Sequence, residues 1–518
     1  MSILNYFSQM KRISFLIIAF FTISISQAQN TTDALRYSTT DNTGTARFVA
    51  LSGAMGALGG DFSATQLNPA GGAVFLNSNL TLSGSLLHLK NETNYFNNSE
   101  KSTSDDFTLN QIGGVFVINN SNESSAFKKF NIGINYNTTK NLNNSMFIAG
   151  TGNTSIGDFF LEQAQGIPLD LLNLQSGESI GNLYSYLGRN QGTTAQNAFL
   201  GYQAFLFDPL DADDPTNTIY TSNVAGNSFN QEYSYLSQGY NSKFSINFST
   251  QVTDNYYFGV NINTHTINFD QSSFLLERNN NSGSMVQGVG FGNNLSVNGA
   301  GISAQIGAIA KVANNIRLGL SFETPTWYQI SEETTQYLES RRIVNGQDQY
   351  TVVDPRVLNV YEDYNLSTPA NVTASAAYIF GQDGLISFDY SYKNYSSIKY
   401  STIDDYQDTY FSNLNNQIDN TLKGTSTFNA GAEYRISQLS LRGGFHFEES
   451  PYKNTDIIGD RIGFSLGAGY NVGSYNVDLA YSRSEQERNQ QLYSVGLTDT
   501  AKINSVYNNV VLSLGFNF

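Results

Sequence analysis

The sequence of 518 residues contains no cysteine, one tryptophan, eight prolines and only three histidines. Without cysteine, the chain can form neither disulfide bonds nor thiolate metal sites. The histidines are His88, His265 and His446, and no two of them have the spacing of a metal-ligand pair. We therefore expect no metal site and no other cofactor.

Charged residues are also few, at 14% of the chain, and acidic residues outnumber basic residues by 43 to 27. The net charge of −16 argues against nucleic acid as a partner, because such binding depends on Lys and Arg neutralising phosphates. The sequence has no phosphate-binding loop and no G-x-S-x-G nucleophile elbow, and its scattered Ser, His and Asp residues define no catalytic triad. These absences predict a protein that is not an enzyme.

Long apolar runs are missing except near the N-terminus. There, Lys11 and Arg12 precede an apolar stretch over residues 13–25, and a small-residue site ends at Ala28. This order is typical of a secretory signal peptide, which we expect to comprise residues 1–28 and to be cleaved after Ala28. Because no later segment approaches the roughly 20 apolar residues of a spanning helix, any membrane insertion must use strands.

The chain is rich in glycine, tyrosine and phenylalanine, and from about residue 75 onward its hydrophobicity alternates with a period of two. In the last segment, Val510, Leu512 and Leu514 share one face, whereas Ser513 lies on the other. Such alternation predicts strands whose two faces meet different environments. The pattern recurs in 14 segments, near 79–91, 107–118, 129–139, 239–252, 255–270, 297–313, 315–330, 368–380, 384–398, 423–437, 439–449, 460–472, 474–486 and 505–518.

These segments predict an all-β fold, a 14-stranded antiparallel β-barrel that spans an outer membrane and covers residues 76–518. Their number is even, as in bacterial single-chain barrels, and most reach the roughly 9–11 residues that a tilted strand needs to cross a bilayer. The connections alternate between tight turns, such as Gly473, and longer polar loops. Counting back from Phe518 places the tight turns, and with them both termini, on the periplasmic side.

Two connections on the long-loop side are much larger than the others. Residues 140–238 and 331–367 are predicted to be extracellular insertions that fold over the mouth of the barrel, since structureless loops of this size are uncommon. The first insertion includes helix-like stretches around 156–174 and 193–207.

The segment between the signal peptide and the first strand, residues 29–75, does not alternate and is rich in glycine and alanine. A 14-stranded barrel is wider than side chains alone can fill, so we expect this segment to fold inside the lumen. Glycine there permits close backbone packing and turns with positive φ.

In these features the sequence resembles the FadL/TodX family of outer-membrane transporters for long-chain fatty acids and other hydrophobic compounds. The resemblance extends from about residue 45 to the C-terminus, apart from the two insertions. It rests on Asn68-Pro69-Ala70 after the Gly/Ala-rich stretch, on Ser367-Thr368-Pro369, and on Leu441-Arg442-Gly443-Gly444-Phe445 followed by Ser450-Pro451.

The resemblance implies that residues 29–75 are a hatch that plugs the barrel, and that ligand leaves sideways beside a kinked third strand, here 129–139. Lateral exit would keep an acyl chain out of water, which is worth roughly 0.8 kcal/mol per CH₂. Gly133 is the candidate for the kink, because glycine inside a strand often marks a bend; the equal alternative is that it gives the hatch room. The hatch residues implied are Gly59, Gly60, Asp61, Asn68, Pro69, Ala70 and Gly71.

Inward-facing arginines are candidates for binding a substrate carboxylate. Arg435 and Arg442 are suited to this role, because arginine can hold a carboxylate with two parallel hydrogen bonds. Alternatively they pair with neighbouring glutamates or with the hatch, as buried charges normally do. The acidic run Asp208, Asp211, Asp213 and Asp214 lacks an EF-hand pattern, which favours a solvated loop over a calcium site.

Two hypotheses of function follow. The first is a monomeric, passive, hatch-gated channel for hydrophobic small molecules such as long-chain fatty acids, surrounded by outer-membrane lipid. The second is a FadL-like barrel that binds proteins as a component of a secretion or surface-attachment system, with residues 140–238 as its binding surface. An open porin for polar solutes would leave the Gly/Ala-rich segment unexplained.

Overall fold

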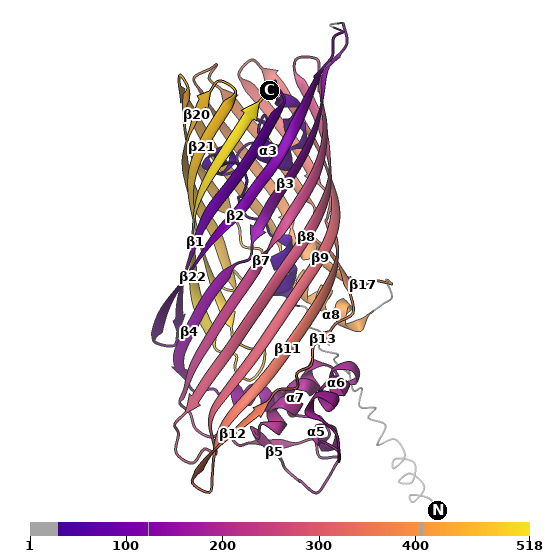
Figure 1. Cartoon of the computed structure of the whole chain (residues 1–518), viewed down its shortest axis with the longest axis vertical. Helices are drawn as coiled ribbons and strands as arrows, with labels where there is room; N and C mark the ends of the chain where they lie inside the picture. The colour runs from indigo at the N-terminus through magenta and orange to yellow at the C-terminus, as the bar shows by residue number, and fades with distance from the viewer. Residues whose placement is uncertain (1–29, 123, 405–407) are drawn as a thin grey trace, which may run out of the picture.

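The computed structural model describes residues 30–122, 124–404 and 408–518; the expected signal peptide, 1–28, lies outside the described residues. The predicted fold is confirmed, because fourteen antiparallel strands form a closed barrel (Figure 1). The barrel closes where the first strand pairs with the last, from Asn79 opposite Asn517 to Asn94 opposite Lys502.

Four of the wall strands are interrupted and consist of two successive elements, β3–β4, β10–β11, β14–β15 and β16–β17. The wall elements are β1 (Asn79–Tyr95), β2 (Asn98–Asn119), β3 (Phe127–Asn141), β4 (Asn144–Gly152), β7 (Phe229–Val252), β8 (Tyr256–Asn279), β9 (Val286–Ala313), β10 (Ile316–Glu323), β11 (Trp327–Val344), β14 (Tyr364–Ser367), β15 (Asn371–Ile379), β16 (Gly384–Asn394), β17 (Lys399–Thr402), β18 (Gly424–Ile436), β19 (Leu439–Glu448), β20 (Ile458–Val472), β21 (Tyr475–Gln491) and β22 (Thr500–Asn517).

The alternation in the sequence has a direct structural cause. On β22 the side chains of Val510, Leu512 and Leu514 point outward and are 42–49% exposed, whereas Val511 and Ser513 point inward and are buried. Hydrocarbon accepts the outward apolar side chains, and closing the sheet pairs the backbone of the first strand with that of the last. The exposed apolar residues thus form a band around the barrel, as in outer-membrane barrels.

The tight turns gather at one end of the barrel, together with the C-terminus (Figure 1). Thr253 and Ser437 adopt positive φ values of 54° in these turns, and Gly473 has φ 63°. The expectation that both termini lie at this end is wrong for the N-terminal segment. Its first described residue, Asn30, lies beside β17 toward the other end, where its carbonyl accepts a hydrogen bond from Tyr400 Oη at 3.3 Å.

Much of the sequence expected to be insertion forms wall instead. Within 140–238, β4 and the first part of β7 pair with each other, from Asn144 opposite Ser237 to Gly152 opposite Phe229. Within 331–367, β11 continues the ladder of β9 beyond β10. Alternation is weak in these stretches because they extend beyond the membrane, where the outward face meets water rather than lipid.

The rest of the first insertion folds as a helical cap at the loop end (Figure 1). Helices were expected around 156–174 and 193–207, and the structure adds one between them. An apolar core that includes Phe160, Tyr184 and Phe199 holds the cap against β9 and β11. The cap elements are α4 (Ile156–Ala164), α5 (Leu169–Leu172), α6 (Ile180–Asn190), α7 (Thr193–Gln203), β5 (Phe207–Pro209) and β6 (Tyr220–Ser222).

The second insertion adds β12 (Gln347–Val353) and β13 (Asn359–Val360), which pair with β11. A further helix, α8 (Thr409–Thr421), follows β17 and packs Phe411, Leu414 and Ile418 into a second apolar core. No helix among the described residues is long and apolar enough to cross a membrane.

Candidate functional site

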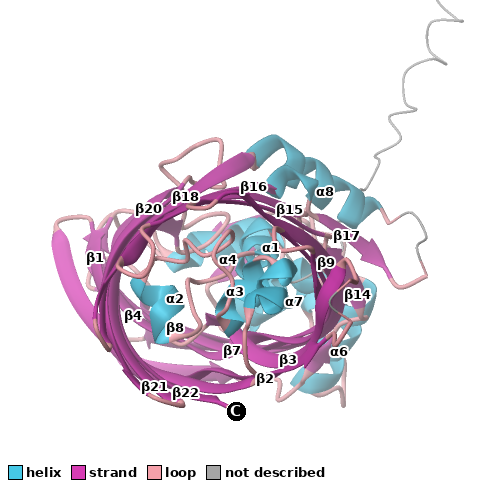
Figure 2. Ribbon diagram, turned by 90° about the horizontal axis from the view of Figure 1, so that it is seen from above, coloured by secondary structure: helices cyan, strands magenta, loops and turns pink. Residues whose placement is uncertain are grey.

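Residues 30–75 lie inside the barrel, in view when the barrel is seen along its axis (Figure 2). They form three short helices and a 3-10 turn, and we call them the hatch. Their backbone is buried against the inner face of the wall, so the lumen is filled where they lie. The elements are α1 (Thr31–Ser38), α2 (Ala46–Ala50), α3 (Phe62–Leu67) and η1 (Pro69–Val74).

Asn68 joins two parts of the hatch to the wall. Its Nδ2 donates to the carbonyls of Gly56 at 2.8 Å and of Ala308, on β9, at 3.1 Å. Its Oδ1 accepts from the backbone of Ala70 at 3.1 Å, which starts the turn formed by Pro69. Asn68 is 1% exposed, so all of these bonds are shielded from water.

The wall carries glycines where the hatch approaches most closely. A Cβ on Gly307 or Gly259 would overlap Asn68 or Pro69, and one on Gly319 would lie 2.5 Å from the carbonyl oxygen of Gly56. The missing side chains therefore create the space in which the Asn68-Pro69-Ala70 turn sits.

Gly59, Gly60 and Gly71 form the central crossing of the hatch. Gly59 and Gly60 have φ of +61° and +66°, and the backbone N–H of Gly60 donates to the carbonyl of Gly71 at 3.1 Å. A Cβ on Gly71 would lie 3.2 Å from Cα of Gly59. Glycine is required here both for the left-handed turn and for the close backbone contact.

Asp61 begins α3 and ties it to the preceding loop. Its carboxylate accepts from the backbone N–H of Ser63 at 2.8 Å and from Thr45 Oγ1 at 2.8 Å. Burial raises the pKa of Asp61, and the nearby positive charge of Arg47 opposes this rise.

The two arginines predicted to bind a substrate carboxylate are already paired. Glu433, whose side chain is 1% exposed, accepts hydrogen bonds from Arg435 at 2.6 Å, Arg442 at 2.7 Å and Arg47 of the hatch at 2.9 Å. Arg442 also binds Asp478 at 2.5 Å. This geometry matches the alternative in which the arginines pair with glutamate and hatch.

This ionic cluster lines a cavity between the hatch and the tight-turn end of the barrel. Ser437, Gln438 and Asn471, which belong to the turns, line it as well. Arg435 and Arg442 therefore lie on the side of the hatch that faces the tight turns rather than on the side that faces the cap.

Gly133 does not mark a bend in the third strand. It lies in an unbroken ladder, opposite Val115 of β2 and Asn247 of β7, and it faces the hatch. A small cavity is lined by Gly133, Phe62 and Gln66, in keeping with the alternative that glycine gives the hatch room. The strand is irregular further on, where its register with β7 shifts between Thr138 and Lys140.

Beyond this irregularity the wall has a seam. The ladder between β2 and β3 ends where Gln111 lies opposite Asn137, although β2 itself runs on and stays paired with β1 as far as Asn98. Across the seam, Thr138 Oγ1 donates to the carbonyl of Leu109 at 2.8 Å, and Asn141 Nδ2 donates to Thr108 Oγ1 at 2.8 Å.

Glycines on β4 allow it to pass close to the end of the β1–β2 hairpin. A Cβ on Gly150 would lie 2.7 Å from the carbonyl oxygen of Tyr95, and one on Gly152 would lie 2.5 Å from the ring of Phe96. The carbonyl of Ser145 on β4 accepts hydrogen bonds from the side chains of Asn91 at 2.9 Å and Ser102 at 3.0 Å. Side-chain hydrogen bonds therefore join the strands here.

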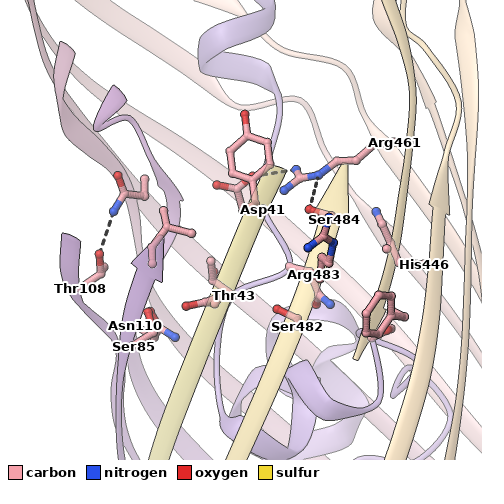
Figure 3. A pocket seen from close by; sticks show the side chains of 18 of the residues that line it. Asp41, Thr43, Ser85, Thr108, Asn110, His446, Arg461, Ser482, Arg483 and Ser484 are labelled. Carbon is pink, nitrogen blue, oxygen red and sulfur yellow. Dashed lines mark hydrogen bonds and ion pairs between the residues drawn. The ribbon is translucent and has the colours of Figure 1, made fainter. Parts of the chain in front are cut away.

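A cavity adjoins the seam (Figure 3). It is lined by hatch residues, including Asp41 and Thr43, and by inward residues of the wall. Thr108 and Asn110 on β2, together with Thr138 and Asn141 on β3, line it from the two sides of the seam. A molecule in this cavity would therefore reach the seam directly.

The cavity also contains a cation. Arg461 Nη1 lies 2.9 Å from Asp41 Oδ1, and its Nε donates to Ser484 Oγ at 3.2 Å; both partners are labelled in Figure 3. The guanidinium lies over the ring of Tyr507, with its centre 4.9 Å from the ring centroid. His446, which lines the same cavity, bonds Asn429 through Nδ1 at 2.7 Å.

Arg461 and Asp41 were not predicted as site residues. Arg461 lies on a strand whose alternating hydrophobicity predicts an inward position for it, so the sequence pattern could have selected this residue. What the sequence cannot show is that a hatch carboxylate 420 positions away meets this arginine.

No cluster of metal-ligating residues is present among the residues that the structure describes. In the acidic run, Asp211 Oδ1 accepts from the backbone of Asp213 at 3.0 Å, and Asp214 Oδ1 accepts from the backbone of Thr216 at 2.9 Å. These carboxylates stabilise the turn of the β5–β6 hairpin.

Comparisons with known proteins agree with this architecture. A family model described as outer membrane protein transport protein (OMPP1/FadL/TodX) matches residues 215–518, more than half of the chain. A search of curated protein sequences finds no match.

Two solved structures are similar in fold. A FadL homologue from Pseudomonas aeruginosa is 14% identical with a TM-score of 0.52, over 93% of this chain and 100% of that chain. The toluene transporter TodX from Pseudomonas putida is 13% identical with a TM-score of 0.50, over the same shares. At such low identity these likenesses establish the fold alone.

Proposed function

The chain belongs to the OMPP1/FadL/TodX family of outer membrane transport proteins, and from this premise we propose that it takes up hydrophobic small molecules, long-chain fatty acids among them. Uptake occurs by passive diffusion through a lumen that is gated by the hatch. The protein is an outer-membrane β-barrel and a channel for hydrophobic compounds. The fatty acid, the gating and the path of exit are the proposal.

One observation carries the proposal: a cavity inside the barrel adjoins both the hatch and a seam in the wall. A water-filled pore would offer an acyl chain no gain in free energy. A cavity with a side opening to the membrane lets each methylene stay out of water, worth roughly 0.8 kcal/mol per CH₂.

Gating by the hatch is supported by the bonds that hold it. The turn at Asn68 and the carbonyl of Pro69, which accepts from Asn247 at 3.0 Å, join the hatch to β7 and β9. Asp389 on β16 accepts from the backbone N–H of Gly56 at 2.8 Å. The hatch contributes no strand to the sheet of the wall, so it can shift without opening the ladder of the wall.

Lateral exit is supported by the seam. Separating β2 from β3 beyond Gln111 breaks side-chain hydrogen bonds such as that between Asn141 and Thr108, each worth about 0.5–1.5 kcal/mol. Separating two strands elsewhere in the wall would leave a whole backbone ladder unpaired in hydrocarbon.

A ligand with a carboxylate fits the polar side of the cavity. The guanidinium of Arg461 has five N–H donors, and its bonds to Asp41 and Ser484 use two of them. The remaining donors can hold a carboxylate, and Leu87 and Tyr507 line the same cavity for the acyl chain.

The proposal is tested by native mass spectrometry of the purified protein and by uptake of palmitate and toluene into cells that produce it. We expect bound acyl chains, and uptake of palmitate that the Arg461→Gln variant reduces about tenfold or more, since a hydrogen bond to a charged group is worth about 1.5–3 kcal/mol. Toluene uptake should remain within twofold. If Arg461→Gln leaves palmitate uptake unchanged, the assignment of this cavity is wrong.

One observation favours the second candidate, a barrel that binds proteins. The cap over residues 153–228 shares an apolar core with the wall and has one basic residue, Arg189. Its eight acidic residues give a net charge of −7; they are Asp158, Glu162, Asp170, Glu178, Asp208, Asp211, Asp213 and Asp214. A partner that co-purifies in mild detergent, without bound lipid, would favour this candidate over transport.

A further inference from the structure

The wall is much taller on one side of the barrel than on the other. β7, β8, β9 and β11 lie side by side and continue far toward the cap, as their long ladders show and as Figure 1 displays. On β9, the last large apolar residue of the outer face is Ile302, which lies opposite Trp327 of β11. Above this level most side chains on the outer face of the four strands are polar, although Leu236 and Tyr240 on β7 are exposed there as well.

A groove crosses this outer face. Its floor consists of short polar side chains from four adjacent strands, and its two ends are the exposed side chains of Leu236 and Leu358. The pairing aligns them in two rows, Leu236–Ser272–Asn294–Thr335 and Gln238–Asp270–Ser296–Glu333. At about 4.8 Å per strand, the rows are about 14 Å long.

Two aromatic rings border the groove on the side away from the membrane. Tyr337 and Phe274 follow the first row on their strands, and their ring centroids are 6.0 Å apart with an angle of 21° between the ring planes. Between them lies Gly292, where a Cβ would overlap the ring of Tyr337. The absence of a side chain at Gly292 therefore lets the tyrosine ring lie against the sheet.

We propose that this groove binds the saccharide of a glycolipid in the outer leaflet. A sugar presents hydroxyls that both donate and accept hydrogen bonds, and the amides, hydroxyls and carboxylates of the two rows offer both kinds of partner. A sugar ring also has a face of C–H groups, which packs on the electron-rich face of an aromatic ring such as Tyr337. The groove thus combines the two contacts that a sugar needs.

The distance of the groove from the edge of the apolar band favours a saccharide that is attached to a membrane lipid. Thr264, which lies opposite Ile302, marks the edge of the apolar band on β8, and Asp270 is six residues further on. Six residues correspond to about 20 Å of strand, or about 15 Å of height at the usual tilt. Phospholipid headgroups extend only about 5–7 Å beyond the hydrocarbon, so only a lipid with a longer, glycan headgroup reaches the groove.

This site is separate from the lumen, and its role would be to hold the protein in a layer of glycolipid rather than to transport. It faces outward, whereas the cavity beside the seam lies inside the barrel. Substitutions in the groove should therefore leave uptake of hydrophobic molecules unchanged.

The test measures affinity of the full-length protein in detergent for core oligosaccharide freed of lipid from rough-form lipopolysaccharide, with dextran as an unrelated polysaccharide. We expect the wild type to bind the core oligosaccharide and not dextran. The variants Tyr337→Ala and Asn294→Ala should each bind about tenfold more weakly. Tyr350→Ala removes another exposed aromatic side chain, 73% exposed on β12, and should stay within twofold.

Folding of each variant is checked by comparing the gel mobility of heated and unheated samples. Ser296→Trp is a further variant, which fills the groove and should abolish binding. Equal affinity of the wild type and all groove variants would overturn the proposal. Absence of binding by the wild type, or equal binding of dextran, would overturn it as well.

Discussion

Replacing Gly319 by alanine should loosen the hatch without disturbing the barrel. Gly319 lies on β10 and faces the lumen, where a Cβ would be 2.5 Å from the carbonyl oxygen of Gly56 and 3.1 Å from Cα of Ala57. Carbon and oxygen normally approach to about 3.3 Å, so this part of the hatch must move by about 0.8 Å.

The displacement affects two hydrogen bonds of Gly56. Its carbonyl accepts from Asn68 at 2.8 Å and its N–H donates to Asp389 at 2.8 Å. Adding 0.8 Å to such a bond puts it beyond the limit of about 3.2 Å. Overpacking costs about 1–3 kcal/mol, and each of the two hydrogen bonds is worth about 1 kcal/mol. Because relaxation of the hatch recovers part of this cost, we expect the docked position of the hatch to be destabilised by about 2–4 kcal/mol.

A loss of 2–4 kcal/mol shifts the equilibrium between docked and displaced hatch by about 30- to 700-fold. Conductance in planar bilayers should therefore show frequent large openings in Gly319→Ala that are rare in the wild type. Gly443→Ala is the matched control, because its Cβ would point outward and meet its nearest atom, of Leu466, at 3.6 Å. Conductance in folded Gly319→Ala equal to that of Gly443→Ala would refute the reasoning.

Three further predictions concern the hatch, the ionic cluster and the apolar band. Asn68→Ala removes hydrogen bonds to Gly56, Ala308 and Ala70 and should raise hydrogen exchange of the hatch amides by at least tenfold, with the strands unchanged. Glu433→Gln removes the carboxylate that pairs with Arg47, whereas Arg442 keeps its bond to Asp478, and it should destabilise the barrel by about 3–5 kcal/mol, measured by unfolding in denaturant. Glu487→Gln, in an exposed pair with Lys502, is its control and should cost less than about 1 kcal/mol. Leu512→Arg should cost about 2–4 kcal/mol in lipid vesicles, because the side chain faces hydrocarbon; full stability would contradict the placement of the band.

The barrel was predictable from the sequence because lipid and lumen impose opposite demands on neighbouring residues. Val511 and Leu512 differ by one position, yet one is buried against the lumen and the other faces lipid, and this contrast is visible in the sequence itself. The extension of β7, β8, β9 and β11 was not predictable in the same way. Water lies outside it, so residues such as Asp270 and Asn294 occupy the outer face and the contrast fades.

The hatch was located in the sequence by its glycines, but its partners were not. Gly319 and Gly307 lie about 250 positions from the residues they accommodate, and no local pattern connects them. Arg435 and Arg442 were selected by their inward position, while the pairing of Glu433 with Arg47 depends on a contact 386 positions apart. Gly133, the residue predicted to mark a bend, lies in a regular ladder, and the register of the third strand shifts instead between Thr138 and Lys140, next to the point where pairing with β2 ends.

The central claim, that hydrophobic ligands leave through the seam, is tested most directly by closing the seam with a disulfide. The chain has no cysteine, and the side chains of Thr108 and Asn141 meet across the seam at 2.8 Å. In the double variant Thr108→Cys/Asn141→Cys, palmitate uptake should fall to the level of cells without the protein when the disulfide forms, and return on reduction. Full uptake with the disulfide formed would contradict the account.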